Sequence, residues 1–317
     1  MFVITQFIGL YVLNANPFEI KTIVNGTTQI AENPSLSWIQ PPQITQESDF
    51  SMYFGSLLIS FIIAIVILFL LTKFKINVVL RIWFFSVVSI ALFITINAIL
   101  LKSPLAIFAN SLFFIIPAVI VALVLGFIKI FRQNFLVHNL TELLIYPGIA
   151  TVFVPILNLW FIIVLLILIS IYDMWAVWHS GIMQKMAKYQ INKLKVFSGF
   201  FVPYISKEMR MNLKKLKKSK IKKKIKVNMA ILGGGDIVFP IISSGVVLKT
   251  GSISLPFHLL PNFAFHGGFL PAVFVIAGAT LGLTLLFVFS EKKKFYPAMP
   301  FISAGIFLGL ILSQILL

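Results

Sequence analysis

The sequence contains no cysteine and only four histidines among its 317 residues. Without thiols there can be no disulfide framework, no thiolate nucleophile and no cysteine-ligated metal site. The four histidines are scattered, so they do not form the short spacings that are typical of zinc sites. We therefore predict a protein that needs no metal and no cofactor.

Charged residues are also scarce, at 11% of the chain, and only nine residues are acidic. By contrast, 59% of the residues are hydrophobic, and the mean hydropathy is +1.02. A water-soluble core does not need so large a share of apolar residues. These proportions predict an integral membrane protein.

The apolar residues fall into runs that match the thickness of a bilayer. A helix that crosses the hydrocarbon core needs about 20 apolar residues, and eight such runs follow one shorter run at the amino terminus. We therefore predict an all-α membrane protein with nine transmembrane helices. The predicted spans are 1–15, 51–72, 77–101, 105–128, 140–157, 158–180, 227–248, 264–289 and 295–317.

Two long hydrophilic segments interrupt what we otherwise predict to be one polytopic membrane domain over residues 1–317. Residues 16–50 are polar and rich in proline and asparagine, which predicts an outer loop with a short strand at Ile20–Val24. Residues 181–226 form a basic loop. This loop divides six amino-terminal spans, within 1–180, from three carboxyl-terminal spans, within 227–317.

Most of the positive charge lies in the basic loop. Fifteen of the 26 lysine and arginine residues fall between Lys185 and Lys226. Such a run beside membrane spans indicates binding to anionic lipid at the membrane surface, and not to nucleic acid. The predicted spans place only Lys21, Lys102 and Lys249 on the side of the membrane opposite to the basic loop. Because positive charge gathers on the cytoplasmic side, this predicts a cytoplasmic amino terminus and an external carboxyl terminus.

Most of the acidic residues have ordinary positions in the predicted loops or at a span end. Glu142 lies near the start of the fifth span, where a position at the membrane interface is the simplest interpretation. Asp173 and Asp236, however, lie well inside spans that contain no lysine or arginine. Because an ionisable group at membrane depth costs roughly 2.5 to 3.5 kcal/mol, these two aspartates indicate a functional site.

The two aspartates lie at similar predicted depths. Asp173 precedes Lys185 by twelve residues, and Asp236 follows Lys226 by ten, which places them roughly 18 and 15 Å from the basic loop along a helix. Two carboxyl groups that meet in a low-dielectric site share one proton. One can then activate water while the other stabilises an oxyanion, which is the chemistry of aspartic proteases.

Three glycines, Gly233, Gly234 and Gly235, stand directly before Asp236. They remove every Cβ from almost one helical turn, so another helix, a substrate backbone or water can approach the main chain. Pro240 would deprive the Asp236 carbonyl of its helical hydrogen bond. We predict a local break in the span, although close helix packing alone would also explain the glycines.

Three short motifs on the sixth, seventh and ninth predicted spans resemble the Y-D, G-x-G-D and P-A-L motifs of presenilin and signal peptide peptidase, the intramembrane aspartyl proteases. They are Tyr172-Asp173, Gly233 to Asp236, and Pro297-Ala298-Met299. The resemblance also covers the span count and the long loop between spans six and seven. Met299 is a departure, because the family usually has leucine at this position.

This resemblance implies a presenilin-like fold and an endopeptidase that hydrolyses peptide bonds within transmembrane segments of membrane proteins. Asp173 and Asp236 would be the catalytic pair. The other motif residues would contact the substrate, namely Tyr172, Gly233, Gly234, Gly235, Pro297, Ala298 and Met299. A helical substrate must unwind before cleavage, so segment 220–227 is expected either to pair with it as a strand or to act as a lipid-binding tether.

The predicted orientation is similar to that of presenilin, whereas signal peptide peptidase is inverted in the membrane. The resemblance therefore favours transmembrane helical substrates whose amino termini lie outside. The chain has no large soluble domain and looks like an archaeal presenilin homologue. That likeness implies the cell membrane of an archaeon and activity without accessory subunits.

An alternative from another class is a proton- or cation-coupled transporter or channel that uses the buried aspartate pair. This hypothesis accounts for Asp173, Asp236 and the glycines. It leaves Tyr172, the motif at Pro297 and the basic loop unexplained, and the two halves of the chain show no inverted repeat. The motifs favour the protease.

Overall fold

The structure of the protein is a computed structural model. Most of the predicted basic loop, including segment 220–227, lies outside the residues that it describes. The described residues are 1–24, 27–42, 44, 46–73, 77–104, 112–132, 134–180, 197–204, 228–250, 252–254, 264–289 and 296–316.

Within these ranges the chain forms nine α-helices, each of which overlaps one of the predicted apolar runs. They are α1 (Phe2–Ala15), α2 (Glu47–Lys73), α3 (Asn77–Leu101), α4 (Leu112–Phe127), α5 (Phe135–Phe153), α6 (Leu159–Trp175), α9 (Gly235–Lys249), α10 (Phe269–Phe289) and α11 (Met299–Leu316). Short turns of other helix types are η1 (Pro34–Ile39), η3 (Ile128–Arg132), η4 (Val154–Ile156) and η5 (Ala176–Ser180).

Seven helical segments of the described chain are long and apolar enough to cross a membrane. They include α2, α3, α10 and α11, and also α4, α5 and α6 together with the short turns that extend them. Helix α1 is apolar but has 14 residues, and α9 has 15. The helices thus support an integral membrane protein, while the count of nine spans stays a prediction.

The seventh apolar run begins as a strand and not as a helix. The sequence predicts a helix from residue 227, but Asn228–Gly233 forms β4 and α9 begins only at Gly235. An unbroken apolar run suits a buried strand as well as a helix, so the pattern of residues could not distinguish the two. The break predicted at the glycines is therefore a change from strand to helix.

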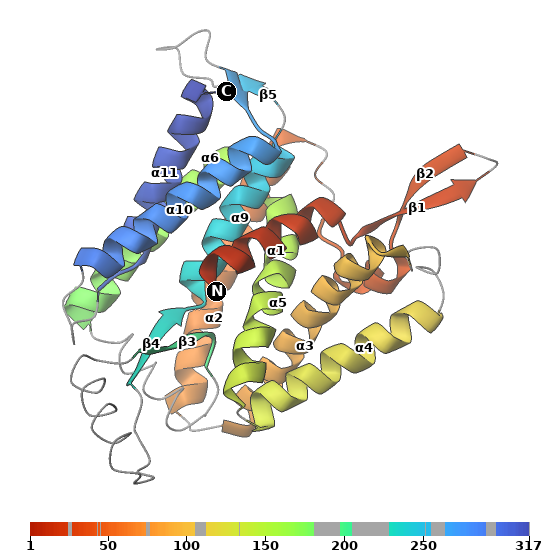
Figure 1. Ribbon diagram of the computed structural model, residues 1–317, viewed down its shortest axis with the longest axis horizontal. Helices are drawn as coiled ribbons and strands as arrows, with labels where there is room; N and C mark the ends of the chain where they lie inside the picture. The colour runs from red at the N-terminus through yellow and green to blue at the C-terminus, as the bar shows by residue number, and fades with distance from the viewer. Residues whose placement is uncertain are drawn as a thin grey trace, which may run out of the picture.

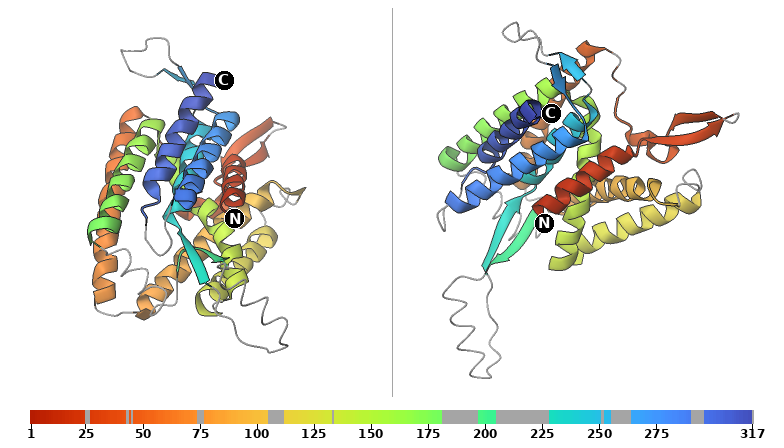
Figure 2. Two further views of the ribbon diagram at one scale, coloured as in Figure 1. Left: turned by 60° about the vertical axis from the view of Figure 1, so that its left-hand side comes forward. Right: turned by 45° about the horizontal axis from the view of Figure 1, so that its top comes forward.

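Three two-stranded antiparallel sheets accompany the helices. The predicted strand at Ile20–Val24 lies within β1 (Glu19–Val24), which pairs with β2 (Thr27–Glu32). Strand β3 (Gly199–Tyr204) pairs with β4, with Gly199 opposite Gly233. Strand β5 (Ser252–Ser254) pairs with β6 (Ala264–His266), where the sequence predicts the start of the eighth span. The β3–β4 sheet lies at the end of the helices opposite to β5 and the carboxyl terminus (Figures 1 and 2).

The helices pack around two hydrophobic cores. The larger core joins α1, α5, α6, α9, α10 and α11, and the smaller one joins α3, α4 and another face of α5. Helix α9 is central, because it contacts α1, α5, α6, α10 and α11 (Figure 1). Helix α9 therefore lies within the helix bundle.

Helices α10 and α11 approach each other very closely. A Cβ built on Gly305 would lie 2.2 Å from the Gly278 carbonyl oxygen, and a Cβ on Gly278 would lie 2.1 Å from the Gly305 carbonyl oxygen. Gly282 and Gly309, one turn further along each helix, make equally close backbone contacts. The i, i+4 spacing of these glycines is typical of tight helix pairs in membranes. This contact fixes α11, and with it Met299 at its first residue.

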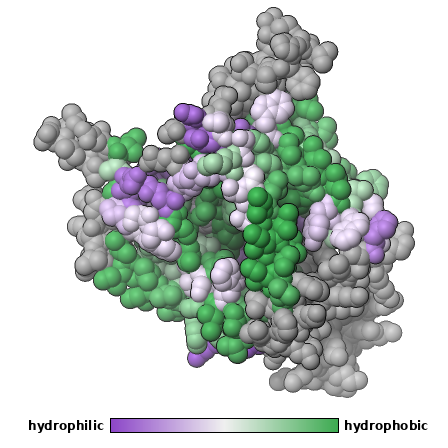
Figure 3. Space-filling model, turned by 180° about the vertical axis from the view of Figure 1, so that it is seen from behind, coloured by the Kyte–Doolittle hydropathy of each residue, from purple (hydrophilic) through white to green (hydrophobic). Residues whose placement is uncertain are grey.

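The outer surface of the helices is apolar. Hydrophobic side chains cover much of the described face in Figure 3, and hydrophilic ones lie mainly toward its edges. In α2, for example, only 6% of the apolar span is buried. A surface of this kind suits lipid and not water.

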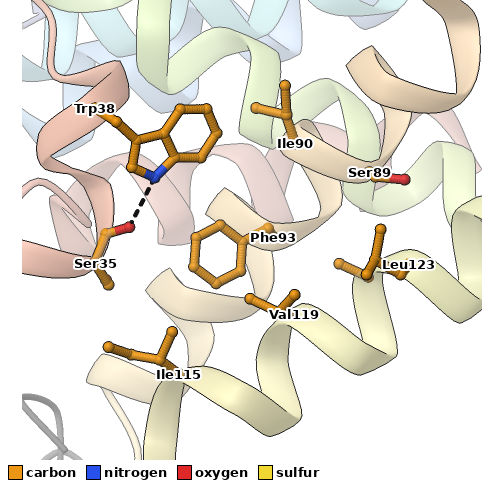
Figure 4. A pocket seen from close by; sticks show the side chains of 9 residues that line it. Ser35, Trp38, Ser89, Ile90, Phe93, Ile115, Val119 and Leu123 are labelled. Carbon is orange, nitrogen blue, oxygen red and sulfur yellow. Dashed lines mark hydrogen bonds between the residues drawn. The ribbon is translucent and has the colours of Figure 1, made fainter. Parts of the chain in front are cut away.

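A pocket between η1, α3 and α4 is lined by none of the predicted site residues. Apolar side chains such as Phe93, Ile115 and Val119 line it, with Trp38 of η1 at one side (Figure 4). None of its lining residues is acidic or basic. The chemistry predicted from the sequence therefore belongs to another part of the molecule.

Candidate active site

Asp173 lies near the end of α6 and is buried, with 6% of its surface exposed. Its Oδ2 atom accepts a hydrogen bond of 3.0 Å from the backbone N–H of Met299. The N–H of Ala298 also interacts with this carboxylate. The first N–H groups of a helix have no partner within the helix, and Met299 begins α11. Asp173 therefore caps α11 from a neighbouring helix.

The motif at the start of α11 suits this contact. The Ala298 carbonyl accepts a hydrogen bond of 3.1 Å from the Ile302 N–H, so Ala298 is the N-cap residue. Its methyl group cannot accept a hydrogen bond from the first N–H groups of the helix, which leaves them for Asp173. The side chains of Pro297 and Met299 are buried. The motif thus presents its backbone to the carboxylate and packs its side chains into the protein.

Asp236 lies in the first turn of α9, directly after β4. Gly234 is the N-cap residue of this helix, and no side chain caps it. The Asp236 carboxylate folds back toward Gly233, since a Cβ on Gly233 would lie 3.1 Å from Asp236 Oδ2. A negative charge in the first turn is favoured by the helix dipole. The change from strand to helix therefore sets the direction of this carboxylate.

The two aspartates are brought near each other by the packing of three helices. Helix α6 contacts both α9 and α11, and these two contact each other. Asp236 consequently lies within electrostatic range of Asp173. One turn before Asp173, the hydroxyl of Ser170 donates to Ser303 Oγ of α11 at 2.9 Å. This second polar link holds α6 and α11 together beside the carboxylates.

The three glycines before Asp236 have different surroundings. A Cβ on Gly234 would lie 2.9 Å from the Tyr146 hydroxyl and 2.8 Å from Ser198 Oγ. At Gly235 the nearest atom would lie at an ordinary contact distance of 3.7 Å. Side chains are therefore restricted at Gly233, by the carboxylate, and at Gly234, by its neighbours. Gly235 has room for one.

Tyr172 does not lie in the interior with Asp173. Its side chain is 46% exposed, and the centre of its ring lies 6.5 Å from that of Trp175. It occupies the outer surface of α6, which an approaching helix or lipid can reach. A substrate contact by Tyr172 stays a prediction.

Comparison with protein families decides which class of protein carries this site. The family model described as "Signal-peptide peptidase, presenilin aspartyl protease" matches residues 28–317. The chain belongs to this family. It is therefore an aspartyl protease, a hydrolase, and the transporter hypothesis is not favoured.

Two solved structures are similar to this chain. Both are described as structures of a presenilin family intramembrane aspartate protease, one in the C222 space group and one in the P2 space group. The TM-scores are 0.56 and 0.51, each at 15% sequence identity. Both alignments cover 99% of this chain, and they cover 98% and 97% of the other chains. At this identity the likeness shows the fold. A search of curated proteins found no match.

A buried polar cluster in this presenilin-family protease is missing from the sequence prediction. Glu142, predicted to lie near the membrane interface, is completely buried within the protein, and its depth in the membrane stays a prediction. Lys129 of η3 forms an ion pair with Glu142 Oε1, and His138 Nε2 lies 3.6 Å from the same oxygen. Tyr146 also interacts with this carboxylate. Only the spacing of four residues from His138 to Glu142 could have indicated this cluster in the sequence, because Lys129 comes from a different helical segment.

The described side chains do not suggest another kind of site. Within the described ranges, histidine, aspartate and glutamate do not gather in groups of three or more that could hold a metal ion. The arrangement that can do chemistry is the pair of carboxylates at the junction of α6, α9 and α11. It offers a proton donor, a proton acceptor and adjacent backbone N–H groups.

Proposed function

We propose that this protease cleaves peptide bonds within transmembrane segments, with Asp173 and Asp236 as its catalytic pair. One observation carries the proposal. In a chain of an aspartyl protease family, the two aspartates of different helices lie within electrostatic range at the packed junction of α6, α9 and α11. The mechanism uses water as the nucleophile and requires no metal or cofactor.

The two carboxyl groups begin the cycle with one proton between them. The ionised carboxylate accepts a proton from water as the water oxygen bonds to the peptide carbon, and the protonated carboxyl gives its proton to the carbonyl oxygen. The resulting gem-diol then transfers a hydroxyl proton to one carboxylate. At the same time the C–N bond breaks, and the nitrogen takes a proton from the other carboxyl. The pair again holds one proton.

The β3–β4 sheet supports a way to present the substrate. Strand β4 ends at Gly233, three residues before Asp236, and among the described strands it pairs only with β3. An extended chain can add to a free strand edge through main-chain hydrogen bonds. We propose that an unwound substrate segment pairs beside β4 and passes between the carboxylates, close to Pro297, Ala298 and Met299. The strand predicted at 220–227 lies outside the described residues.

The topology belongs to the same proposal. Nine spans, with α1 and α9 as the short ones, would leave the amino terminus in the cytoplasm and the carboxyl terminus outside. The position of β3–β4 at the end opposite to the carboxyl terminus supports this arrangement (Figure 2). Substrates would be transmembrane helices with external amino termini. We also propose that residues 181–226 bind anionic lipid, that the protein lies in the cell membrane of an archaeon, and that it acts without accessory subunits.

The proposal is tested with purified protein in detergent and a single-span substrate. Asp173→Asn and Asp236→Asn preserve the shape of each side chain and remove its ability to exchange a proton as a carboxyl group. Asp49→Asn, in the outer part of α2, is the matched control. We expect cleavage by the wild type and the control, and none by either of the other variants. Full cleavage by Asp173→Asn or Asp236→Asn would refute the shared-proton mechanism.

A further inference from the structure

Tyr146 of α5 is fully buried beside the turn that leads to Asp236. Its exposure is 1%, and its hydroxyl oxygen lies 3.5 Å from Ser198 Oγ. The same hydroxyl stands 2.9 Å from the place where Gly234 would carry a Cβ. The phenol also lies within electrostatic range of Asp236. Tyr146 therefore closes one side of the glycine turn.

A buried ion pair lies behind Tyr146. The side chains of Lys129 and Glu142 are 3% and 0% exposed, and Glu142 lies four residues, about one turn, before Tyr146 on α5. Among the described residues, Glu142 Oε2 is buried without a hydrogen-bond partner of good geometry. Buried ion pairs seldom add net stability over apolar residues, whereas loss of one partner strands a charge. A role in fixing local geometry accounts for the location of this pair better than a role in stability.

Helix α5 also makes hydrogen bonds to β3, the strand that pairs with β4 next to the glycine turn. His138 Nε2 lies 2.8 Å from the Gly199 carbonyl oxygen of β3. The Asn139 side chain donates to the Phe201 carbonyl at 2.9 Å and accepts from the Phe201 N–H at 3.2 Å. Since Gly199 pairs with Gly233 of β4, α5 fixes the turn through β3 as well as through Tyr146.

We propose that Tyr146 is a positioning residue for Asp236. Its hydroxyl, one turn beyond Glu142 of the Lys129–Glu142 pair on α5, limits where the main chain at Gly234 can lie, and so sets the first turn of α9 and the direction of the Asp236 carboxylate. This inference rests on the proposed catalytic role of Asp236. A misplacement of about 1 Å at a reacting group can lower a rate by up to about 100-fold. A change at Tyr146 should therefore lower kcat.

The first test removes only the hydroxyl. Tyr146→Phe keeps the ring in the core, and Tyr11→Phe, at a tyrosine of α1 that is 47% exposed, is the matched control. For Tyr146→Phe we expect kcat to fall about tenfold, while KM and the melting temperature stay at the values of the control. An unchanged kcat overturns the inference. So does a loss of activity that only follows a loss of folded protein, since that would indicate a purely structural role.

The second test removes the Lys129–Glu142 ion pair without leaving a single buried charge. The double variant Lys129→Met/Glu142→Leu takes away both charged groups at once, and we expect its kcat to fall by about the same factor as that of Tyr146→Phe. Adding Tyr146→Phe to it should lower kcat no further, because both changes act through one hydroxyl. If the fall in kcat of the triple variant equalled the product of the falls in the other two variants, the ion pair would not act through Tyr146.

A third test needs no proteolysis. Gly234→Ala places a methyl group 2.8 Å from Ser198 Oγ and 2.9 Å from the Tyr146 hydroxyl, so its melting temperature should fall. In a Ser198→Ala background, which removes the first contact, the addition of Tyr146→Phe should regain part of the loss. No recovery would overturn the inference by itself. A wild type that folds and shows this recovery, but cleaves no transmembrane substrate, would instead overturn the proposed function.

Discussion

The glycine contact between α10 and α11 predicts that Gly305→Ala will move Met299 away from Asp173. The new methyl carbon would lie 2.2 Å from the Gly278 carbonyl oxygen, whereas carbon and oxygen in close contact lie about 3.3 Å apart. The two backbones must therefore separate by about 1 Å. Met299 is six residues before Gly305 on the same helix. Its N–H, now 3.0 Å from Asp173 Oδ2, would move out of hydrogen-bonding range.

This separation should be visible in stability and in activity. Overpacking of a close contact costs about 1 to 3 kcal/mol, which should lower the melting temperature in detergent. Loss of the cap on α11 also displaces the Asp173 carboxylate, so cleavage of a single-span substrate should slow by more than about tenfold. Both quantities are measured on the same purified sample.

Gly55→Ala in α2 is the matched control, because nothing lies within 4 Å of the Cβ that it adds. Alanine is also the better helix former, so this variant should be at least as stable as the wild type. If Gly305→Ala and Gly55→Ala behaved alike, the close approach of α10 and α11 would be refuted. If Gly305→Ala lost stability but kept full activity, the link from this contact to Asp173 would be wrong.

Three further predictions concern the site itself. Asp173→Ala should destabilise the protein by about 0.5 to 2 kcal/mol because the Met299 N–H loses its acceptor; Asp173→Asn retains an acceptor and should unfold at a higher temperature in thermal scans. Gly235→Ala should fold as the wild type does, since the nearest atom to its Cβ is 3.7 Å away, and a clear fall in its melting temperature would contradict this geometry. Cleavage should show a bell-shaped dependence on pH with its maximum on the acid side, because low pH removes the base and high pH removes the acid of the pair; a rate that rises steadily with pH would exclude the shared proton.

Long apolar runs made the helices predictable. The third predicted span, 77–101, has the same bounds as α3, and the strand at Ile20–Val24 lies within β1. Asn158 marks the start of α6, and its side chain accepts a hydrogen bond of 2.9 Å from the Phe161 N–H. Such signals are local in the chain, so they can be recognised without knowledge of the tertiary structure.

The start of the seventh run was not predictable in the same way. Residues 228–233 have an apolar pattern that is compatible with either a strand or a helix. Pairing with β3, which lies far away in the sequence, decides for the strand. Glu142 shows the same limit, because its burial depends on Lys129 from another helical segment. Our prediction did not use the spacing of the glycines at 278, 282, 305 and 309, which is typical of close helix packing.

The sequence by itself determined that this is a membrane protein with two aspartates deep in apolar runs, and its short motifs indicated the aspartyl protease family. These properties depend on composition and local order along the chain. Only the tertiary structure decided that Asp173 caps α11, through a hydrogen bond between residues 126 positions apart. It also decided that the glycine turn before Asp236 meets Tyr146. Contacts between distant segments arise from the packing of several helices at once, and no local pattern of residues specifies them.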